Sequence, residues 1–264
     1  MDETVVLRRL EGGVLRLSLN RPHKLNALNR ESAEALIAAL RSSEHDHDVR
    51  CIIVSGEGRG FCSGQDLDVF RGRYESGERI DVAEHLRHTY NVVTLLLRRI
   101  EKPVIASVNG IVAGVGLSLA LACDLRIAAS DATFTVGFGR IGLVPDGGGS
   151  LLLPALLGLG KALELALLNE RINADEALRI GLVNRVVPTD QLEESTERVA
   201  AQLVEMPPSA LAYTKRAFNR AAIPNLAGWL NEEADLQQLA SDHPDHREGV
   251  LAFLEKRAPA FNRR

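Results

Sequence analysis

The sequence has few aromatic residues, few cysteines and little excess charge, and each shortage excludes a class of protein. Aromatic side chains make up 4% of the 264 residues, and the formal net charge is −4. Because there is no basic excess, a nucleic-acid-binding surface is not expected. The three cysteines, Cys51, Cys62 and Cys123, lack the spacing of metal ligands and suit buried positions in a reducing compartment.

Signals for a membrane span or for secretion are also weak. The uncharged segment from Pro103 to Cys123 contains Gly110-x-x-x-Gly114, a pattern found in membrane helices. Asn109, glycines and serines interrupt it, so it is better interpreted as a strand, a turn and a helix. The opening residues MDETVVL lack the basic and then apolar pattern of a secretion signal. We therefore expect a cytoplasmic protein without a membrane span.

One loop contains potential metal ligands, in the sequence HDHD at positions 45–48. Alternating polar residues in a loop are more typical of a solvated surface, and no other cluster completes a site. No metal is therefore expected. His85 and His88 could share a helix face, and we expect both on an exposed helix.

The first hundred residues alternate between strand-like and helix-like patterns. Residues 56–66 form a glycine-rich turn after a strand, and residues 67–82, charged and weakly periodic, predict a mobile flap. The elements expected around them are strands at Val5–Leu10, Val14–Leu19 and Cys51–Ser55, and helices at 30–42 and 82–99.

The stretch from Pro103 to Gly149 carries the clearest sign of function. It is expected to contain a strand at 104–108, a glycine-rich turn at 109–116, an apolar helix, a strand at 125–129 and the sequence PDGGG at 145–149. Glycine lets the backbone approach a ligand closely, and a helix N-terminus offers unpaired N–H groups to a negative oxygen. Asp146 is the one acid near this turn, although spacing alone favours a turn or N-cap role for it.

The last hundred residues are expected to be mainly helical. Residues 151–168 should form helical pieces broken by Pro154 and Gly158. A short helix begins near Asn173, and helices at 189–205, 208–222, 225–240 and 244–256 follow a strand at Val183–Val187. The pattern predicts an α/β core with some parallel strands and a helical cap or oligomer arm. The sequence contains no phosphate loop, dinucleotide-binding glycine motif or serine-nucleophile elbow.

A series of motifs resembles the crotonase (enoyl-CoA hydratase/isomerase) superfamily over residues 5–262. The motifs are NRPHKLNALN at 20–29, GFCSGQDL at 60–67, KPVIASVNGIVAGVG at 102–116, CDLRIAASDATF at 123–134, GLVNRVV at 181–187 and EGVLAFLEKR at 248–257. The resemblance implies a spiral core of ββα repeats at residues 1–200 and a helical trimerisation or cap region at 201–264. It also implies a homotrimer or dimer of trimers and an acyl-coenzyme A thioester as substrate, with no separate cofactor.

In the superfamily two backbone N–H groups bind the thioester oxygen as it becomes an enolate. Motif matching places these donors on Gln65 and Val115, which agrees with the glycine turns found above. The resemblance also assigns Ser63, Gly64, Asp66 and Gly114 to the substrate-binding turns. Each donor of such a pair stabilises an oxyanion by about 3 kcal/mol. The Gln65 side chain need contribute nothing chemically, and Asp66 is expected to order its turn.

Two departures from the superfamily pattern favour isomerisation over hydration. The two glutamates that hydratases use to add water correspond to Ser118 and Phe138 here, and neither side chain is a useful acid or base near neutral pH. Asp146 matches the single acid of some isomerases, and residues 138–150 most resemble the phenylacetate-pathway isomerases that act on a ring epoxide. A dry pocket lined by Phe138 and Phe134 would raise the pKa of Asp146 toward that of a proton shuttle.

The resemblance also suggests residues that bind coenzyme A. Lys24 matches a basic residue near the phosphates, and Phe253 and Lys256 match C-terminal residues that cover the cofactor moiety, often from a neighbouring subunit. A solvated lysine or a core phenylalanine is the alternative for each. Two alternative functions remain open: a hydratase with atypical acids, and a catalytically silent acyl-CoA-binding protein.

Overall fold

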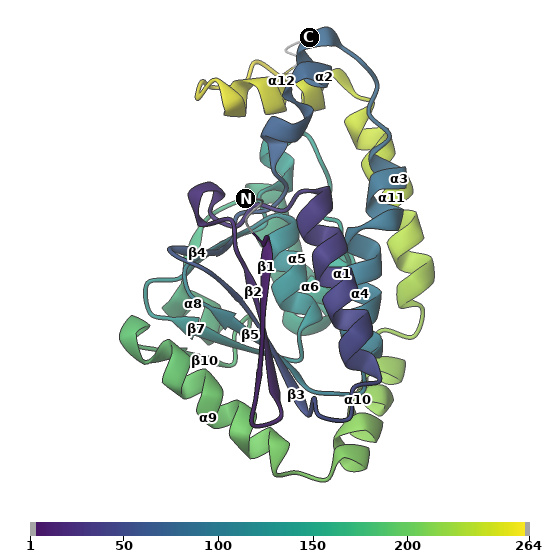
Figure 1. The fold of residues 1–264 in the computed structure, drawn as a ribbon. Helices are drawn as coiled ribbons and strands as arrows, with labels where there is room; N and C mark the ends of the chain where they lie inside the picture. The colour runs from purple at the N-terminus through teal and green to yellow at the C-terminus, as the bar shows by residue number, and fades with distance from the viewer. Residues whose placement is uncertain (1–3, 262–264) are drawn as a thin grey trace.

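The computed structural model describes residues 4–261, which form two β-sheets surrounded by helices (Figure 1). The larger sheet has the strand order β1 (Val6–Glu11), β2 (Val14–Leu19), β3 (Cys51–Gly56), β5 (Val104–Val108), β7 (Leu125–Ala129) and β10 (Arg185–Val187). The smaller sheet has the order β4 (Gly60–Cys62), β6 (Ile111–Ala113), β8 (Thr133–Thr135) and β9 (Ile172–Asn173).

The strands repeat in a pattern of two strands and a helical segment. β3, β5 and β7 each enter the larger sheet, and the strand that follows each of them, β4, β6 or β8, enters the smaller sheet. In the larger sheet, the neighbouring strands from β2 to β10 pair in parallel, and β1 pairs with β2 in the antiparallel direction. In the smaller sheet, β8 and β9 are antiparallel. Each repeat therefore brings the end of a large-sheet strand and the start of a small-sheet strand to the same region.

Helices cover both faces of the larger sheet. The α-helices are α1 (Arg30–Glu44), α2 (Arg71–Ser76), α3 (Val82–His88), α4 (Tyr90–Arg99), α5 (Val115–Ala122), α6 (Gly149–Leu157), α7 (Leu159–Leu168), α8 (Ala174–Arg179), α9 (Leu192–Val204), α10 (Pro208–Ala222), α11 (Leu226–Ser241) and α12 (Pro244–Leu254). Short 3₁₀ turns are η1 (Pro22–Lys24), η2 (Leu67–Phe70), η3 (Phe138–Ile141) and η4 (Thr189–Gln191).

The central strands are buried on both faces, which explains their unbroken apolar sequences. All five residues of β5 are buried, as are the first five of β3. Ile53 and Ile105 pack against Leu192 and Val199 of α9, while the opposite face contributes to the main core with α1, α4 and α5. In Figure 1, α9 lies across the sheet on the side away from α1.

Several predicted elements need correction. The helix expected at 82–99 is two helices, because Thr89 leaves the helical conformation (φ −125°, ψ −91°) and its hydroxyl bonds the His85 carbonyl. Pro154 lies inside α6 and does not break it; Gly158, with φ +77°, ends that helix. The flap expected at 67–82 contains η2 and α2. The small-sheet strands, two or three residues long, were too short for sequence periodicity to reveal.

The C-terminal helices return to the core after α9. α11 runs beside α3, and α12 contacts α2, so that α2 and α12 form an upper lobe above the sheets (Figure 1). The predicted boundary between residues 200 and 201 falls within α9, and the division into two regions stays a prediction. Within residues 4–261, no helix is long and apolar enough to span a bilayer.

Candidate active site

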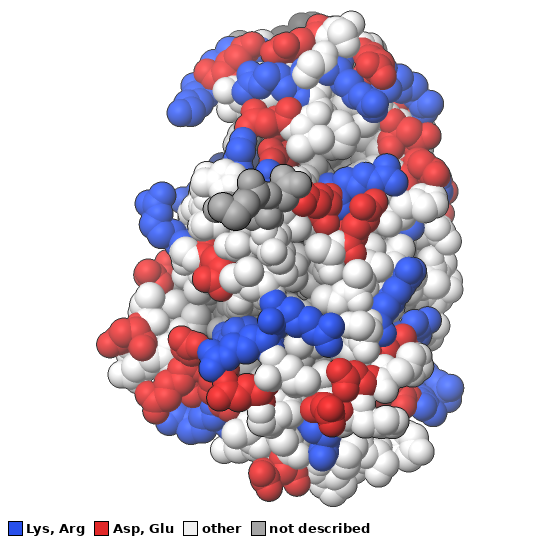
Figure 2. All heavy atoms as spheres, in the orientation of Figure 1, with Lys and Arg blue, Asp and Glu red and all other residues white. Residues whose placement is uncertain are grey.

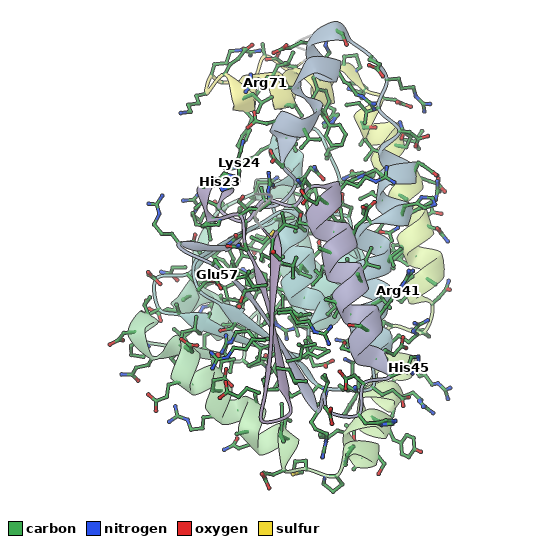
Figure 3. The ribbon with its side chains drawn as sticks, in the orientation of Figure 1. His23, Lys24, Arg41, His45, Glu57 and Arg71 are labelled. Carbon is green, nitrogen blue, oxygen red and sulfur yellow. The ribbon has the colours of Figure 1, made fainter. Side chains whose placement is uncertain are left out.

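A cavity of about 480 Å³ lies where the two sheets meet the upper lobe. Its walls come from the turn after β4, the start of α5, the loop before α6, and side chains of α2, α3, α4, α11 and α12. In Figure 2 the surface is notched between the upper lobe and the body of the protein, with basic side chains on the rim. Figure 3 places Lys24 below this notch and Arg71 above it.

Two glycine turns meet at the floor of the cavity. β4 and β6 pair in parallel, so the turns that follow them are neighbours. Gly64 has φ +103° and Gly114 has φ +54°, and a Cβ on Gly64 would lie 3.1 Å from the Ala113 carbonyl oxygen. Positive φ favours glycine at both positions, and the close approach of the Ala113 carbonyl adds a second requirement at Gly64.

The N–H groups that follow these glycines are available to a ligand. Neither the Gln65 N–H nor the Val115 N–H donates a hydrogen bond within residues 4–261, and both residues line the cavity. Val115 is the first residue of α5, where a helix leaves its N–H groups unpaired. Two such donors beside one cavity can bind a developing oxyanion. The structure thus brings together the two predicted oxyanion-binding residues.

Asp146 lines the same cavity and is 5% exposed. Its Oδ2 accepts a 2.7 Å hydrogen bond from Gln237 Nε2, while its buried Oδ1 has no partner in the described part of the chain. Burial, and then the charge of Glu233, raise the pKa of Asp146 to about 8. The alternative N-cap role is not observed, because Gly148 is the N-cap of α6 and no backbone N–H of residues 4–261 bonds the carboxylate. The alternative turn role is observed, since the Asp146 carbonyl accepts from Gly149 N at 2.9 Å.

Sequence reasoning missed the two α11 residues that surround this acid. Glu233, 1% exposed, accepts hydrogen bonds from Gly148 N at 2.7 Å and Ser150 N at 2.9 Å, and burial raises its pKa. Gln237 is fully buried. Their four-residue spacing places both on one face of a helix, but nothing in the sequence shows that this face is buried.

The two positions that motif matching assigned to the hydratase glutamates hold Ser118 and Phe138. The buried Ser118 hydroxyl donates a 2.6 Å hydrogen bond to the Asp146 carbonyl oxygen and so holds the loop before α6. The Phe138 ring lies in the cavity wall, near Gly114. The other carboxylates that line the cavity, Asp66 and Asp68, are both paired with cations. Asp146 is therefore the cavity-lining carboxylate without a cationic partner within the described residues.

A polar network holds the Gln65 side chain, which sequence reasoning treated as chemically silent. The Tyr90 hydroxyl donates to Gln65 Oε1, His85 Nε2 lies 3.3 Å from the same oxygen, and Gln65 Nε2 donates to the Asp66 carbonyl. His85 lines the cavity and is half-buried, which corrects its expected place on an exposed helix; burial lowers its pKa to about 4. His88 is exposed, as expected.

The two helices of the upper lobe, α2 and α12, are joined by hydrogen bonds above the cavity. The Tyr74 hydroxyl and His246 Nε2 lie 2.9 Å apart, and His246 Nδ1 bonds the Ile141 carbonyl at 2.6 Å. Since a carbonyl only accepts, the His246 proton sits on Nδ1 and Nε2 accepts from Tyr74. Arg247 Nε donates to the Tyr74 carbonyl over 2.7 Å. These hydrogen bonds connect α2 to α12, and the two helices together cover the cavity.

The turn residues near the cavity mouth are mostly engaged with one another. Asp66 accepts from Arg21 Nη2 at 2.8 Å and from Asp68 N, so its carboxylate orders the turn. Ser63 Oγ donates to the Lys24 carbonyl at 3.2 Å. Lys24 lines the cavity and forms a 2.5 Å ion pair with Asp68, which raises the pKa of the lysine.

Of the two predicted C-terminal residues, one lines the cavity and the other does not. Phe253 lines the cavity of its own chain and is 63% exposed, so it is not a core residue. Lys256 lies beyond the end of α12, is exposed, and is not among the cavity-lining residues. Arg171, which sequence reasoning did not consider, lines the cavity without an ion-pair partner in the described part of the chain.

Potential metal ligands are scattered over the described part of the chain. Among residues 4–261, no three histidine, cysteine or acidic side chains form a group that could hold a metal ion. His45 and Asp46 lie at the C-terminal end of α1, away from the cavity, as the label in Figure 3 shows for His45.

Comparison with known proteins agrees with the two-sheet architecture and the paired glycine turns. The enoyl-CoA hydratase/isomerase family model matches residues 9–264. The chain belongs to this family, the crotonase superfamily, and its predicted crotonase-like fold is confirmed. An enoyl-CoA hydratase from Mycobacterium avium subsp. paratuberculosis superimposes with a TM-score of 0.89 at 36% identity, over 98% of this chain and 99% of that one.

The relatives include enzymes of two activities. The 1,2-epoxyphenylacetyl-CoA isomerase of Escherichia coli (strain K12) is 40% identical over 97% of each chain. A probable enoyl-CoA hydratase of Rhodobacter capsulatus is also 40% identical, over 100% of each chain. The short-chain-enoyl-CoA hydratase of Clostridium acetobutylicum is 34% identical over 97% of each chain. Family membership is therefore shown, and the reaction must be argued from the site.

Proposed function

We propose that this protein is an acyl-CoA isomerase that moves one proton between two carbons of a coenzyme A thioester. The observation that supports this proposal is Asp146, a buried carboxyl group that lines the cavity and has one oxygen without a hydrogen-bond partner within residues 4–261. Hydratases of the superfamily use two carboxylates, and the corresponding positions here hold Ser118 and Phe138. A single acid suffices for a reaction that removes a proton and returns it elsewhere.

The proposed mechanism uses one side chain and two backbone groups. Asp146 as carboxylate takes a proton from the acyl chain, and the electron pair of the broken C–H bond enters a dienolate. The Gln65 and Val115 N–H groups stabilise the negative thioester oxygen of that dienolate. Protonated Asp146 then delivers the proton to the other carbon, so the reaction consumes no water and needs no added redox cofactor.

The cavity wall favours an acyl group that contains a ring or a double bond. Aromatic side chains are scarce in the chain, yet several of them line this cavity: Phe70, Tyr74, Tyr90, Phe138 and Phe253. Flat aromatic walls suit a flat acyl group. We propose a ring-epoxide thioester such as 1,2-epoxyphenylacetyl-CoA, or an enoyl-CoA, as substrate, and the name of the E. coli relative supports the former. With the ring epoxide, the bond between the two epoxide carbons also breaks as the ring expands to the oxepin, and no atom is gained or lost.

The test is Asp146→Asn, which keeps the shape of the side chain and removes its proton transfer. We expect double-bond migration on a 3-enoyl-CoA to fall by about 10²-fold to 10⁴-fold, the usual contribution of a general base. Full activity in the variant would eliminate Asp146 as the base. Fast water addition to crotonyl-CoA by the wild type would favour the hydratase alternative. Absence of deuterium exchange at the acyl α-carbon in heavy water would favour a silent binding protein.

We also propose a homotrimer or a dimer of trimers in the cytoplasm. Leu159, Leu163 and Leu167 form one stripe along α7 and are 66%, 46% and 75% exposed, an apolar surface suited to contact with another copy. The cytoplasmic location is supported by three free, buried cysteines. Sedimentation of the wild type should give a trimer or hexamer, and a monomer would contradict the proposal.

A further inference from the structure

The orientation of the Gln237 side chain determines which oxygen of Asp146 is engaged. The Val144 N–H donates to Gln237 Oε1 over 2.9 Å. Because a backbone N–H can only donate, the amide oxygen must face Val144 and the amide NH₂ must face Asp146. That NH₂ donates to Oδ2 over 2.7 Å, in a site where Gln237 is fully buried. Oδ2 is therefore held as an acceptor.

The other oxygen is left to carry a proton. An amide NH₂ cannot accept a hydrogen bond, so protonated Asp146 places its hydrogen on Oδ1. Oδ1 is buried and has no partner within residues 4–261, although Asp146 lines the cavity. A buried polar atom without a partner is uncommon and calls for a specific reason. A reacting carbon of the bound acyl group would supply that reason.

The charge next to Asp146 comes from the same helix, one turn earlier. Glu233 receives three hydrogen bonds, from Gly148 N, Ser150 N and Ser150 Oγ, the last at 2.5 Å. These donors favour its ionised form, and a like charge near Asp146 favours the protonated form of Asp146. The Ser150 hydroxyl also accepts from Trp229 Nε1 at 2.8 Å, which ties α11 to the start of α6.

The other groups around Asp146 supply no competing charge. α4 presents Tyr90, which stays neutral because burial raises its pKa well above its usual value. α5 contains no ionisable side chain except at its end, where it meets Cys123, and its Ser118 bonds the Asp146 backbone. Burial is the main cause of the raised pKa of Asp146, and the side chains that act on its ionisation beyond burial, Glu233 and Gln237, both come from α11.

We propose that α11 controls the proton shuttle: Gln237 confines the transferred proton to Asp146 Oδ1, and Glu233 favours keeping that proton on Asp146 until it is delivered to the second carbon. This inference rests on the proposed isomerase function. In each turnover a substrate C–H bond breaks as the Oδ1–H bond forms, and the same Oδ1–H bond then breaks as hydrogen reaches the second carbon. Gln237 and Glu233 are positioning residues, since they affect the substrate only through Asp146.

The first test measures the proton on Asp146 directly. Infrared titration of the wild type should show a protonated-carboxyl band that Asp146→Asn lacks and that disappears with a midpoint near pH 8, where the pKa of Asp146 lies. Glu233→Gln, which removes the like charge and keeps an acceptor oxygen, should move the midpoint down by roughly one pH unit. Glu232→Gln, an exposed neighbour with the same charge change, is the matched control and should leave it unchanged.

The second test separates positioning from folding. Gln237→Met keeps the length of the side chain and removes both hydrogen bonds. We expect kcat to fall on the order of 10-fold to 100-fold, KM to change by less than about threefold, and the pH limb to move upward. Circular dichroism and thermal melting should show that each variant is folded before its kinetics are interpreted.

The outcomes distinguish this inference from the function on which it rests. If Asp146→Asn isomerises normally, the proposed function fails. If Asp146→Asn is inactive but folded Gln237→Met and Glu233→Gln keep the wild-type kcat and pH limb, the α11 proposal fails alone. A wild-type band that disappears below pH 6 would also overturn it, without any variant of α11.

Discussion

The two halves of the proposed site, one to bind an oxyanion and one to transfer a proton, are built in different ways. The oxyanion-binding half consists of backbone N–H groups on Gln65 and Val115, placed by two adjacent parallel strands and two glycines with positive φ. The proton-transfer half consists of one side chain, Asp146, held by residues of α11 more than 80 positions later in the chain. One half depends on local backbone geometry, and the other depends on long-range packing.

This difference determines at which positions of the site the side chain can vary and at which it cannot. Backbone donors make no demand on the identity of the side chains they precede, so Val115 carries no chemistry in its isopropyl group. A carboxyl group with a raised pKa, by contrast, needs a dry environment and specific neighbours from several elements. If the proposed roles are right, this chain combines the oxyanion site of its family with an acid at Asp146 in place of acids at Ser118 and Phe138.

Among the changes that compare the two halves without altering Asp146 itself, the largest expected effect comes from adding one methyl group to the oxyanion half. Gly64→Ala should lower kcat by about 10²-fold to 10³-fold, the loss typical of one oxyanion donor. The new Cβ would lie 3.1 Å from the Ala113 carbonyl at φ +103°, so the turn must shift and carry the Gln65 N–H with it. Steady-state kinetics on a 3-enoyl-CoA would measure the loss.

Gly72→Ala is the matched control for this substitution. Gly72 lies in α2 with open space around its Cα, so alanine fits there and favours the helix. Activity should remain within about twofold of the wild type. If both variants were equally active, the Gly64 turn would not be holding a catalytic donor.

The proton-transfer half can be tested by the pH dependence of activity and of folding stability. Since the pKa of Asp146 is about 8 and the base must be ionised, kcat/KM should rise through pH 8 and be roughly tenfold lower at pH 7 than on the plateau. The folded state also holds this proton more tightly than the unfolded chain, whose carboxyl titrates near 3.8. Folding stability should therefore fall as pH rises from about 4 toward 8, and Asp146→Asn should remove that component. A flat profile between pH 6 and pH 9 would contradict the assignment.

The sequence predicted the two glycine turns and the strands of the larger sheet because their signals are local. Buried parallel strands such as β3 and β5 appear as unbroken apolar runs, and glycines mark turns with positive φ. The short strands of the smaller sheet gave no signal, because three residues cannot display a period of two. The break at Thr89 was hidden because the flanking residues favour a continuous helix.

The environment of the acid could be predicted only in part. Asp146 itself was found through motif matching, whereas Glu233 and Gln237 were missed because burial of polar residues depends on tertiary packing. His85 was misplaced for the same reason, since its ring is covered by Phe70 and Tyr90 from other elements, with centroids 5.9 and 5.2 Å away. Motif order thus located the acid, and only the fold showed what surrounds it.

A smaller effect is expected where the two halves touch. Ser118 belongs to the oxyanion helix α5 and bonds the Asp146 carbonyl, so Ser118→Ala removes their direct link. The carbonyl keeps its bond from Gly149 N, and we therefore expect a loss of about 1 kcal/mol in the free energy of unfolding. kcat should fall only a few-fold. Urea unfolding and kinetics would measure both, and a 100-fold loss of kcat would mean that Ser118 does more than hold the loop.

The smallest effect is expected at the mouth, outside both halves. Arg171 lines the cavity without an ion-pair partner in the described residues, whereas Lys24 is already paired with Asp68. If Arg171 meets a phosphate of coenzyme A, Arg171→Ala should raise KM by about threefold to fivefold at low salt and leave kcat unchanged, because an exposed charge pair is worth about 1 kcal/mol or less. The difference should shrink as salt screens the pair. Lys24→Ala should raise KM by less, since the lysine charge is shared with Asp68, and the reverse order would return the phosphate-binding role to Lys24.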